Sequence, residues 1–329
     1  MQFRTEIQLL PASFQIAHKD KIFSIGSCFA DRIGEKLAAE KFEVCINPCG
    51  TIFNPLSIAK NLTHTFSEKV SERFVQRDGM WFSYDLHSSV NGKSKQELSE
   101  KISTIHQLSA SRLRECRVLI LTLGTAFVYS LQDGETVANC HKIPASNFKK
   151  DFLEVSEIVK SLKGALLEIK KRNVNLRVIL TVSPVRHIKD TLTLNAVSKS
   201  ALRLAAFQLE NEMDFVEYFP AYEMMIDDLR DYRFYGEDMI HPTAFAEQYI
   251  FQKFIETYSS ASIPLLEKWK ALKKRMEHIV QNENTPEAKA FVKETLAGLK
   301  ALNAKMNLNS EIEFYEHSNR HILNEPKVF

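Results

Sequence analysis

Apolar runs of strand length, separated by longer segments with helical periodicity, limit the folds open to this chain. The runs RVLILTLG at 117–124 and LRVILTVSP at 176–184 are apolar along almost their whole length, and shorter runs lie at 22–25, 42–48 and 214–220. Strands of this kind are buried on both faces, which is typical of parallel sheets covered by helices. The sequence therefore predicts an α/β fold with a parallel sheet between two layers of helices.

The segments between the runs carry apolar residues at helical spacing. The helix expected after the first run has Phe29, Ile33 and Leu37 on one face. A wider stripe before the fourth run comprises Phe152, Val155, Ile158, Val159, Leu162, Leu166 and Ile169. Further helices are expected near 195–212 and from Pro242, because proline suits a first helical turn. Strands and helices then alternate, as they do in folds with a parallel sheet.

The length of 329 residues suits one large α/β domain with an appendage. We predict a main domain at 1–258 and a helical C-terminal appendage at 259–329, which is rich in Lys, Glu, Ala and Leu and breaks at Thr285-Pro286. Residues 56–115 interrupt the alternation and are predicted to form a mostly helical or irregular insertion. A small hairpin is expected at 73–86, because an Asp-Gly pair between apolar runs favours a tight turn.

Charge and cysteine content exclude several classes of function. The chain has 43 basic and 41 acidic residues, a net charge of +2, so no strong field attracts nucleic acid or an anionic membrane. The first 21 residues show neither a signal peptide nor a membrane-spanning pattern. Five cysteines, an odd and small number, favour reduced thiols. We expect a cytoplasmic protein without nucleic-acid or membrane partners, and the oligomeric state stays open.

The turn after the first run carries two candidate nucleophiles, Ser27 and Cys28, within KIFSIGSCFADRIGEKL at 21–37. Ligands of open α/β sheets bind beyond the carboxyl ends of the strands, where this turn is expected. A serine here has its hydroxyl on a sharp turn and its N–H at a helix N-terminus, which favours an oxyanion. Cysteine is the better intrinsic nucleophile. Only one of the two can face a base, and we favour Ser27 because a buried Cys28 packs well against a sheet.

A base for either nucleophile is predicted in GEDMIHPTAF at 236–245. His241 precedes an expected helix, and Asp238 lies one turn upstream, where its carboxylate can fix the tautomer of the ring. Glu237 is an alternative orienting carboxylate. Taken singly, these are a loop histidine and surface acids, so their interpretation as a catalytic pair depends on the nucleophile turn.

Arg186 and His187 follow the fourth run, where they either hold a polar or anionic substrate group or belong to a surface loop. Two other pairs raise the question of metal binding: Cys45 with Cys49, and Cys140 with His141. Structural zinc sites have tighter paired spacings, so packing is the preferred interpretation. The chain lacks a phosphate loop and a dinucleotide-binding motif, and we expect neither a metal nor a cofactor.

Several stretches of the chain, taken in order, carry a resemblance to a known family. They are GSCFA at 26–30, NPCGTIFNP at 47–55, LTLGTAFVY at 121–129, NCHK at 139–142, TVSPVRH at 181–187, YFPAYE at 218–223 and DMIHP at 238–242. The ordered set, over roughly residues 5–255, resembles the GSCFA family of bacterial proteins. This family is similar to the SGNH hydrolase superfamily. The resemblance implies a flavodoxin-like three-layer fold, strand order 2-1-3-4-5 and an esterase-type site.

The resemblance also implies roles for single residues. Ser27 takes the place of the nucleophile, whereas a strict alignment with the superfamily's Gly-Asp-Ser gives Cys28 instead. Asp238 and His241 match its Asp-x-x-His pair.

An oxyanion site is implied less completely by the same resemblance. Gly50 is the implied oxyanion glycine, and Asn47 lies close enough in sequence to assist it. Where the superfamily has Gly-x-Asn-Asp, this chain has Gly124, Thr125, Ala126 and Phe127. The asparagine donor is therefore missing, and Thr125 replaces it only in part.

From this resemblance we expect a hydrolase of O-acyl esters, including small-molecule and carbohydrate esters, with a Ser/Cys–His–Asp mechanism. An O-acyltransferase that uses the same site is the first alternative, and it requires an acceptor groove. The second alternative is a non-catalytic binding protein. The altered Gly-Ser-Cys register favours this alternative, whereas Asp238 and His241 argue against it.

Overall fold

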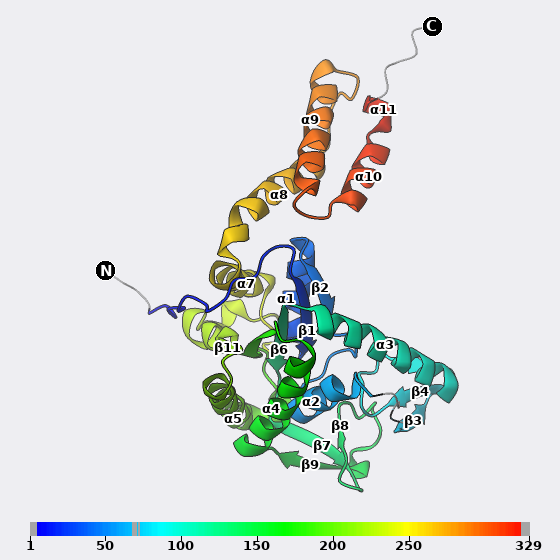
Figure 1. Cartoon of the computed structure of the whole chain (residues 1–329), viewed down its shortest axis with the longest axis vertical. Helices are drawn as coiled ribbons and strands as arrows, with labels where there is room; N and C mark the ends of the chain where they lie inside the picture. The colour runs from blue at the N-terminus through cyan, green and yellow to red at the C-terminus, as the bar shows by residue number, and fades with distance from the viewer. Residues whose placement is uncertain (1–4, 68–70, 72, 324–329) are drawn as a thin grey trace.

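A computed structural model describes residues 5–67, 71 and 73–323, so the outer ends of the two predicted regions, at 1–4 and 324–329, lie outside the described residues. A parallel sheet of five strands forms the centre of the molecule, in the order β11-β10-β6-β1-β2 (Figure 1). Its strands are β1 (Lys21–Gly26), β2 (Glu43–Ile46), β6 (Val118–Leu123), β10 (Arg177–Val182) and β11 (Val216–Phe219). Numbered along the chain these strands are 2-1-3-4-5, so the predicted α/β class and order are confirmed.

Alternate residues of the central strands pack against two layers of helices, because successive side chains of a strand point to opposite faces. Ile22, Val118 and Ile120 face α1 (Cys28–Ala39) and α7 (Ala244–Tyr258) in one apolar cluster. Phe23, Leu119 and Leu121 belong to the cluster on the other face. That face is covered by α2 (Pro55–His64), α3 (Lys95–Glu115), α4 (Val155–Arg172) and α5 (Thr191–Glu212).

Two helix starts differ from the predicted pattern. Phe152 is not in the helix before the fourth strand but ends a strand, because Glu154 caps α4 and forms a capping box with Glu157. The helix expected from Pro242 starts at Ala244, since the Thr243 hydroxyl accepts the N–H of Ala246 as an N-cap.

Two small antiparallel sheets flank the central one. The predicted hairpin is confirmed as β3 (Phe74–Arg77) and β4 (Met80–Ser83), and β5 (Asn91–Gly92) extends it. A second sheet, not predicted, has the order β8-β7-β9. It consists of β7 (Phe127–Leu131), β8 (Thr136–Val137) and β9 (Phe148–Phe152). Both sheets join the main apolar cluster at their inner faces, since Val128 of β7 belongs to it and Phe74 of β3 and Trp81 of β4 pack against it.

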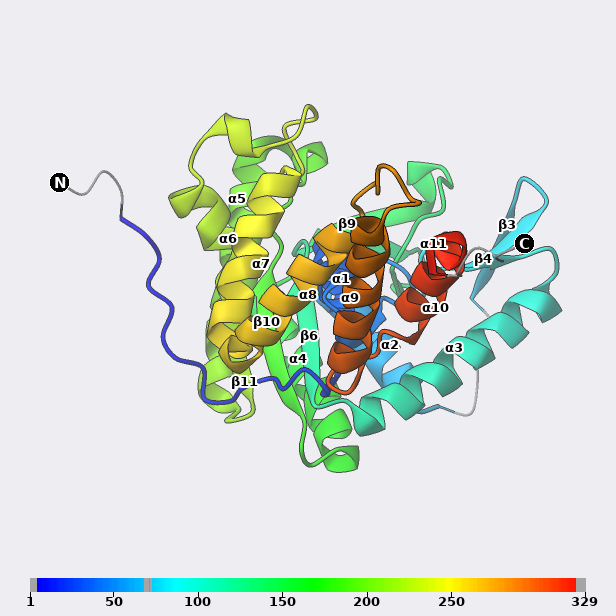
Figure 2. The same cartoon turned by 90° about the horizontal axis from the view of Figure 1, so that it is seen from above.

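The C-terminal helices have an apolar cluster of their own. They are α8 (Ile263–Met276), α9 (Pro286–Asn303), α10 (Asn309–Ser318) and α11 (Arg320–Leu323), and α9 begins at the predicted break. Trp269 and Leu299 lie in this cluster, and the indole N–H of Trp269 donates to the Ala39 carbonyl at the end of α1. Figures 1 and 2 show these helices beyond the layer of α1 and α7, on the side away from β7 and β9.

Short helical turns complete the described structure. They are η1 (Ala145–Asn147), η2 (Ile188–Asp190), α6 (Ala221–Glu223), the π-helix η3 (Met224–Asp228), η4 (Tyr232–Phe234) and η5 (Ser260–Ser262). Within the described part of the chain, none of the helices combines the length and the apolar character that a membrane crossing requires.

Candidate active site

The order of the sheet reverses between β1 and β6, because β1 leads to β2 on one side and β6 leads to β10 on the other. Such a switch point is where open α/β sheets bind ligands, beyond the carboxyl ends of the strands. The candidate residues predicted from the sequence follow β1, β2, β6 and β10 at this edge, and the remaining two lie on the loop before α7.

Gly26 lets the first turn pass directly against β6. Its φ is +138°, and a Cβ here would lie 2.1 Å from the Thr122 carbonyl oxygen. The Gly26 N–H donates to Asn47 Oδ1 at 2.8 Å, and the next N–H, of Ser27, donates to the Thr122 carbonyl at 3.0 Å. Only glycine fits this conformation and this spacing, so the position of the nucleophile turn is fixed.

The two candidate nucleophiles differ in exposure. Ser27 is fully buried and is the N-cap of α1, where its Oγ accepts the Phe29 N–H at 3.3 Å. Cys28 is the first residue of the helix and is partly exposed. Burial raises the pKa of the Cys28 thiol, the Asp31 carboxylate adds to this, and the Lys199 ammonium acts in the opposite direction. Of the two side chains, the one that reaches solvent therefore belongs to Cys28, and its thiol is protonated at rest.

The loop after β2 supports the nucleophile turn. Asn47 bonds Gly26 through Oδ1, and its Nδ2 donates to Asp31 Oδ1 at 2.6 Å, while the Thr51 hydroxyl donates to the other Asp31 oxygen. Gly50 has φ +72°, and its N–H donates to the Asn47 carbonyl at 2.7 Å. Asn47 therefore bonds the turn directly, and the Gly50 N–H, the donor implied for an oxyanion, is bonded to the Asn47 carbonyl.

Gly124 and Thr125 follow β6 and pack against Phe53. Both N–H groups donate to the Phe53 carbonyl, at 2.8 and 3.1 Å. The Thr125 hydroxyl lies 3.1 Å from Ser198 Oγ and accepts the Phe127 N–H at 3.1 Å. The oxyanion role implied by the resemblance stays a prediction, and the contacts show Thr125 joining this loop to α5.

Lys199 is a site residue that the sequence reasoning missed. Its side chain is 1% exposed, and Nζ donates to the carbonyls of Gly124 and Ser183, both at 2.7 Å. Burial lowers the pKa of Lys199 to about 7, although Cys28 opposes this effect. A signal was present, since Lys199 shares the buried stripe of α5 with Ser198 and Leu202. A lysine on such a stripe is unusual and indicates a polar environment at the sheet edge.

We expect the burial of Lys199 to make stability depend on pH. The pKa falls from an ordinary 10.5 to about 7 on folding, so between these values the unfolded chain binds more protons and stability rises with pH. Relative to Lys199→Met, the wild type should gain a few kcal/mol in free energy of unfolding between pH 7 and about pH 10. Urea denaturation across this range measures the difference. Parallel curves for the two proteins would show that the ammonium is not desolvated.

Asp238 orients His241, as the spacing predicted. His241 Nδ1 lies 2.6 Å from Asp238 Oδ2, and Asp238 Oδ1 accepts the N–H groups of Ile240 and His241 at 2.9 and 3.0 Å. Bonds from the His241 side chain, then from these N–H groups, lower the pKa of Asp238 to about 2. The carboxylate therefore stays ionised and holds the proton of the ring on Nδ1, which leaves Nε2 free to accept one. His241 is 53% exposed.

Arg186 and His187 connect this loop to β10. The Arg186 N–H donates to the Ile240 carbonyl at 3.2 Å, and Nη1 donates to the Met239 carbonyl at 3.3 Å. The His187 ring packs edge-on against Phe53, at 5.4 Å between centroids. Burial, then the charges of Lys199 and His241, lower the pKa of His187 to about 3. His187 is therefore a neutral ring whose pKa responds to the charges of both Lys199 and His241.

The charges of these groups influence one another's pKa. Lys199 acts on the pKa of both Cys28 and His187, and His241 acts on that of His187. Cys28 begins α1 after β1, His187 follows β10, Lys199 belongs to α5 and His241 lies on the loop before α7, so the groups are far apart in sequence. The parallel sheet brings them together because the carboxyl ends of its strands share one edge.

The cysteine pairs do not form a metal cluster among the residues that the structure describes. Both ring nitrogens of His141 have protein partners, Ser88 Oγ at 2.9 Å and the Ser83 carbonyl at 2.7 Å. Cys49 is fully buried, and burial raises the pKa of its thiol to about 12. These contacts are those of packed, neutral side chains.

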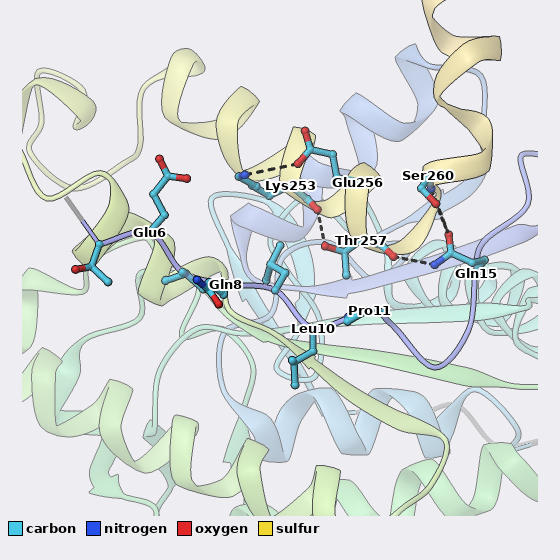
Figure 3. A pocket seen from close by; sticks show the side chains of 12 residues that line it. Glu6, Gln8, Leu10, Pro11, Gln15, Lys253, Glu256, Thr257 and Ser260 are labelled. Carbon is cyan, nitrogen blue, oxygen red and sulfur yellow. Dashed lines mark hydrogen bonds and ion pairs between the residues drawn. The ribbon is translucent and has the colours of Figure 1, made fainter. Parts of the chain in front are cut away.

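A large cavity of about 750 Å³ lies away from this edge (Figure 3). It is lined by residues 5–11 and Gln15 of the N-terminal segment and by the last turn of α7, including Lys253 and Glu256. In Figure 3 Gln15 bridges the Thr257 carbonyl and Ser260. His241 lies at the opposite end of α7, about 15–20 Å along the helix axis. Volume alone therefore does not locate the reactive groups.

A parallel sheet has a cysteine-bearing turn at its switch point, and the loop before α7 carries an Asp-oriented histidine, so the chain is a three-layer α/β protein with a candidate nucleophile and a candidate base. The chain belongs to the GSCFA family, whose model matches residues 21–254. The model of the C-terminal domain of GSCFA domain proteins matches residues 269–320. No curated protein matches the sequence. The first match spans the central sheet and every candidate site residue.

Proposed function

We propose that this protein hydrolyses O-acyl esters, with His241 as general base and Asp238 as its orienting carboxylate. The observation that supports this most directly is the 2.6 Å contact between His241 Nδ1 and Asp238 Oδ2 on the loop before α7. A histidine held in this way accepts a proton from a nucleophile and later returns it to a leaving group.

Cys28 is the nucleophile that the exposure of the two side chains favours. Ser27 Oγ is buried and already accepts the Phe29 N–H as the N-cap, whereas Cys28 is partly exposed. This choice also agrees with the strict alignment of Gly-Ser-Cys on the superfamily's Gly-Asp-Ser. Ser27 then supports the turn, and it stays the alternative nucleophile.

The proposed reaction has two steps. Cys28 Sγ attacks the ester carbonyl carbon while its proton passes to His241 Nε2. The tetrahedral intermediate collapses, and the alcohol leaves with that proton. Water, deprotonated by His241, then cleaves the thioester and releases the carboxylic acid and the free thiol.

The oxyanion of this intermediate has two sources of stabilisation near Cys28. The first is the N-terminus of α1, a helix of 12 residues that starts at Cys28. The second is the buried Lys199 ammonium, held on the Gly124 and Ser183 carbonyls. This charge lies close to where the superfamily has its asparagine donor and this chain has Ala126. We propose that Lys199 takes over part of that role.

Hydrolysis of p-nitrophenyl acetate by wild type and His241→Ala tests the proposal. Loss of the base should lower kcat/KM by about 10²–10⁴-fold. His317→Ala is the matched control, because His317 is an exposed histidine of α10 in the C-terminal appendage. If His241→Ala is as active as wild type, the proposed mechanism is wrong. An inert wild type that transfers acetyl to a sugar hydroxyl would favour the acyltransferase, and one inert in both assays would favour the binding protein.

A further inference from the structure

A cavity of about 190 Å³ lies beside the His241 loop and outside the groups assigned to catalysis. Its lining includes Arg186, Met225, Ile226, Arg230, Tyr232 and Tyr235. Three structural features of this lining, its link to His241, its charge and its backbone, all point to a binding site.

The cavity adjoins His241 through backbone contacts. Arg186 bonds the carbonyls of Met239 and Ile240, the two residues before His241. Tyr235 forms an isolated β-bridge with Pro242, the residue after it. Two residues of the cavity wall are therefore bonded to the loop that carries His241, the proposed base.

The guanidinium of Arg186 is fixed in place at the cavity wall. It stacks on the Tyr235 ring, at 3.7 Å from the centroid, and lies 5.3 Å from the Tyr232 centroid. Tyr235 is 7% exposed, so this stacking surface is itself held in the core. A guanidinium that is already positioned loses little entropy when it forms a bidentate bond with a carboxylate or phosphate.

The charge in the cavity is positive. Arg186 and Arg230 line it, together with the single acid Asp231. The Asp231 carboxylate is bonded elsewhere, since it accepts the Arg233 N–H at 3.0 Å and lies 3.5 Å from Arg233 Nε. The two arginines therefore outnumber the acid and give the lining a positive charge that suits an anion.

A π-helix supplies the apolar part of the lining. Met225 and Ile226 belong to η3 (Met224–Asp228), where the Leu229 N–H reaches back five residues to the Met224 carbonyl at 2.9 Å. Such wide turns are rare and occur frequently at functional sites. Here the turn contributes two apolar side chains to the lining of the cavity.

We propose that this cavity binds the anionic group, a carboxylate or a phosphate, of the ester that His241 and Cys28 cleave. The inference rests on the proposed function in one respect, because only an esterase would make the bound molecule a substrate. The volume lies below the roughly 300 Å³ at which drug-sized pockets begin, so the site takes one small group or ring. The substrate class is then an acylated small molecule that carries a negative charge, such as an acidic or phosphorylated sugar.

Isothermal titration calorimetry of the full chain with D-glucuronate, D-glucose 6-phosphate and D-glucose tests the site. We expect one or both anions to bind with a dissociation constant in the millimolar range, and glucose not to bind. The two anions separate a carboxylate from a phosphate ligand. Arg186→Gln and Arg230→Gln should each weaken binding about tenfold. Arg117→Gln is the matched control, because this guanidinium lies at the amino end of β6, away from the cavity, and bonds the Asn175 carbonyl.

The results separate this inference from the proposed function. Binding is measured without turnover, so anion binding by a protein that hydrolyses no ester would uphold the site and reject the function. Hydrolysis of p-nitrophenyl acetate with no anion binding at about 10 mM would reject the site alone. Equal binding of glucose, or undiminished binding in both Arg186→Gln and Arg230→Gln, would also overturn it. Circular dichroism of each variant confirms folding.

Discussion

Cys28→Ala is expected to lower kcat/KM for p-nitrophenyl acetate roughly 10⁴-fold or more, because it removes the atom that forms the covalent intermediate in the proposed mechanism. The remaining side chains offer no replacement at this position, since Ser27 is buried and caps α1. Rapid quenching followed by mass spectrometry of the wild type should find the acetyl group on the peptide that contains Cys28. His241→Ala is not suitable for trapping this acyl-enzyme. In the proposed mechanism His241 is the base in its formation as well as in its hydrolysis.

Ser27→Ala separates the nucleophile from its neighbour. We expect it to cost about 1 kcal/mol of stability through loss of the N-cap, with a much smaller loss of kcat than Cys28→Ala. The melting temperature and kcat/KM of both variants measure these two effects. An active Cys28→Ala with an inactive, folded Ser27→Ala would reverse the assignment and make Ser27 the nucleophile.

Gly26→Ala is expected to destabilise the protein by about 4 kcal/mol or more, the largest effect of any single methyl group added to the site. The added Cβ would lie 2.1 Å from the Thr122 carbonyl oxygen at φ +138°. Relief requires β1 to move away from β6, and these neighbouring strands pair over five residues, Ile22 to Gly26. Thermal unfolding should show a fall of at least about 8 °C, or the variant should fail to fold.

Gly164→Ala is the control for this prediction. Gly164 lies within α4, and a Cβ there would meet no atom within 4 Å. Alanine is the better helix former, so we expect a gain of about 0.5–1 kcal/mol. A Gly26→Ala protein as stable as the wild type would contradict the close approach of the turn to Thr122.

The fold could be predicted well from the sequence where hydrophobic pattern and local chemistry agree. The apolar runs at 117–124 and 176–184 correspond to β6 and β10, because a strand buried on both faces has no polar alternation. The two errors in predicted helix starts, for α4 and α7, both come from local capping. Glu154 caps α4, so the helix starts at Val155 and excludes Phe152, and Thr243 rather than Pro242 precedes the first residue of α7 as its N-cap.

The candidate site was only partly predictable. Asp238 and His241 are three residues apart, so their contact is local and the spacing alone indicated it. Lys199 was missed because its partners, the carbonyls of Gly124 and Ser183, follow two different strands. Every residue has a backbone carbonyl, so the sequence does not indicate which carbonyls a lysine bonds. These partners are known only from the three-dimensional arrangement of the strands.

The sequence by itself determined the periodicity, the turn after the first strand and the local pair of Asp238 and His241. Each of these depends on residues within about one helical turn of each other, where backbone geometry fixes what can touch. Only the tertiary structure decided that Ser27 is buried while Cys28 is partly exposed, and that Arg186 stacks on Tyr235 beside the base. Burial and long-range contacts depend on how the whole sheet packs, so they cannot be predicted from neighbouring residues in the sequence.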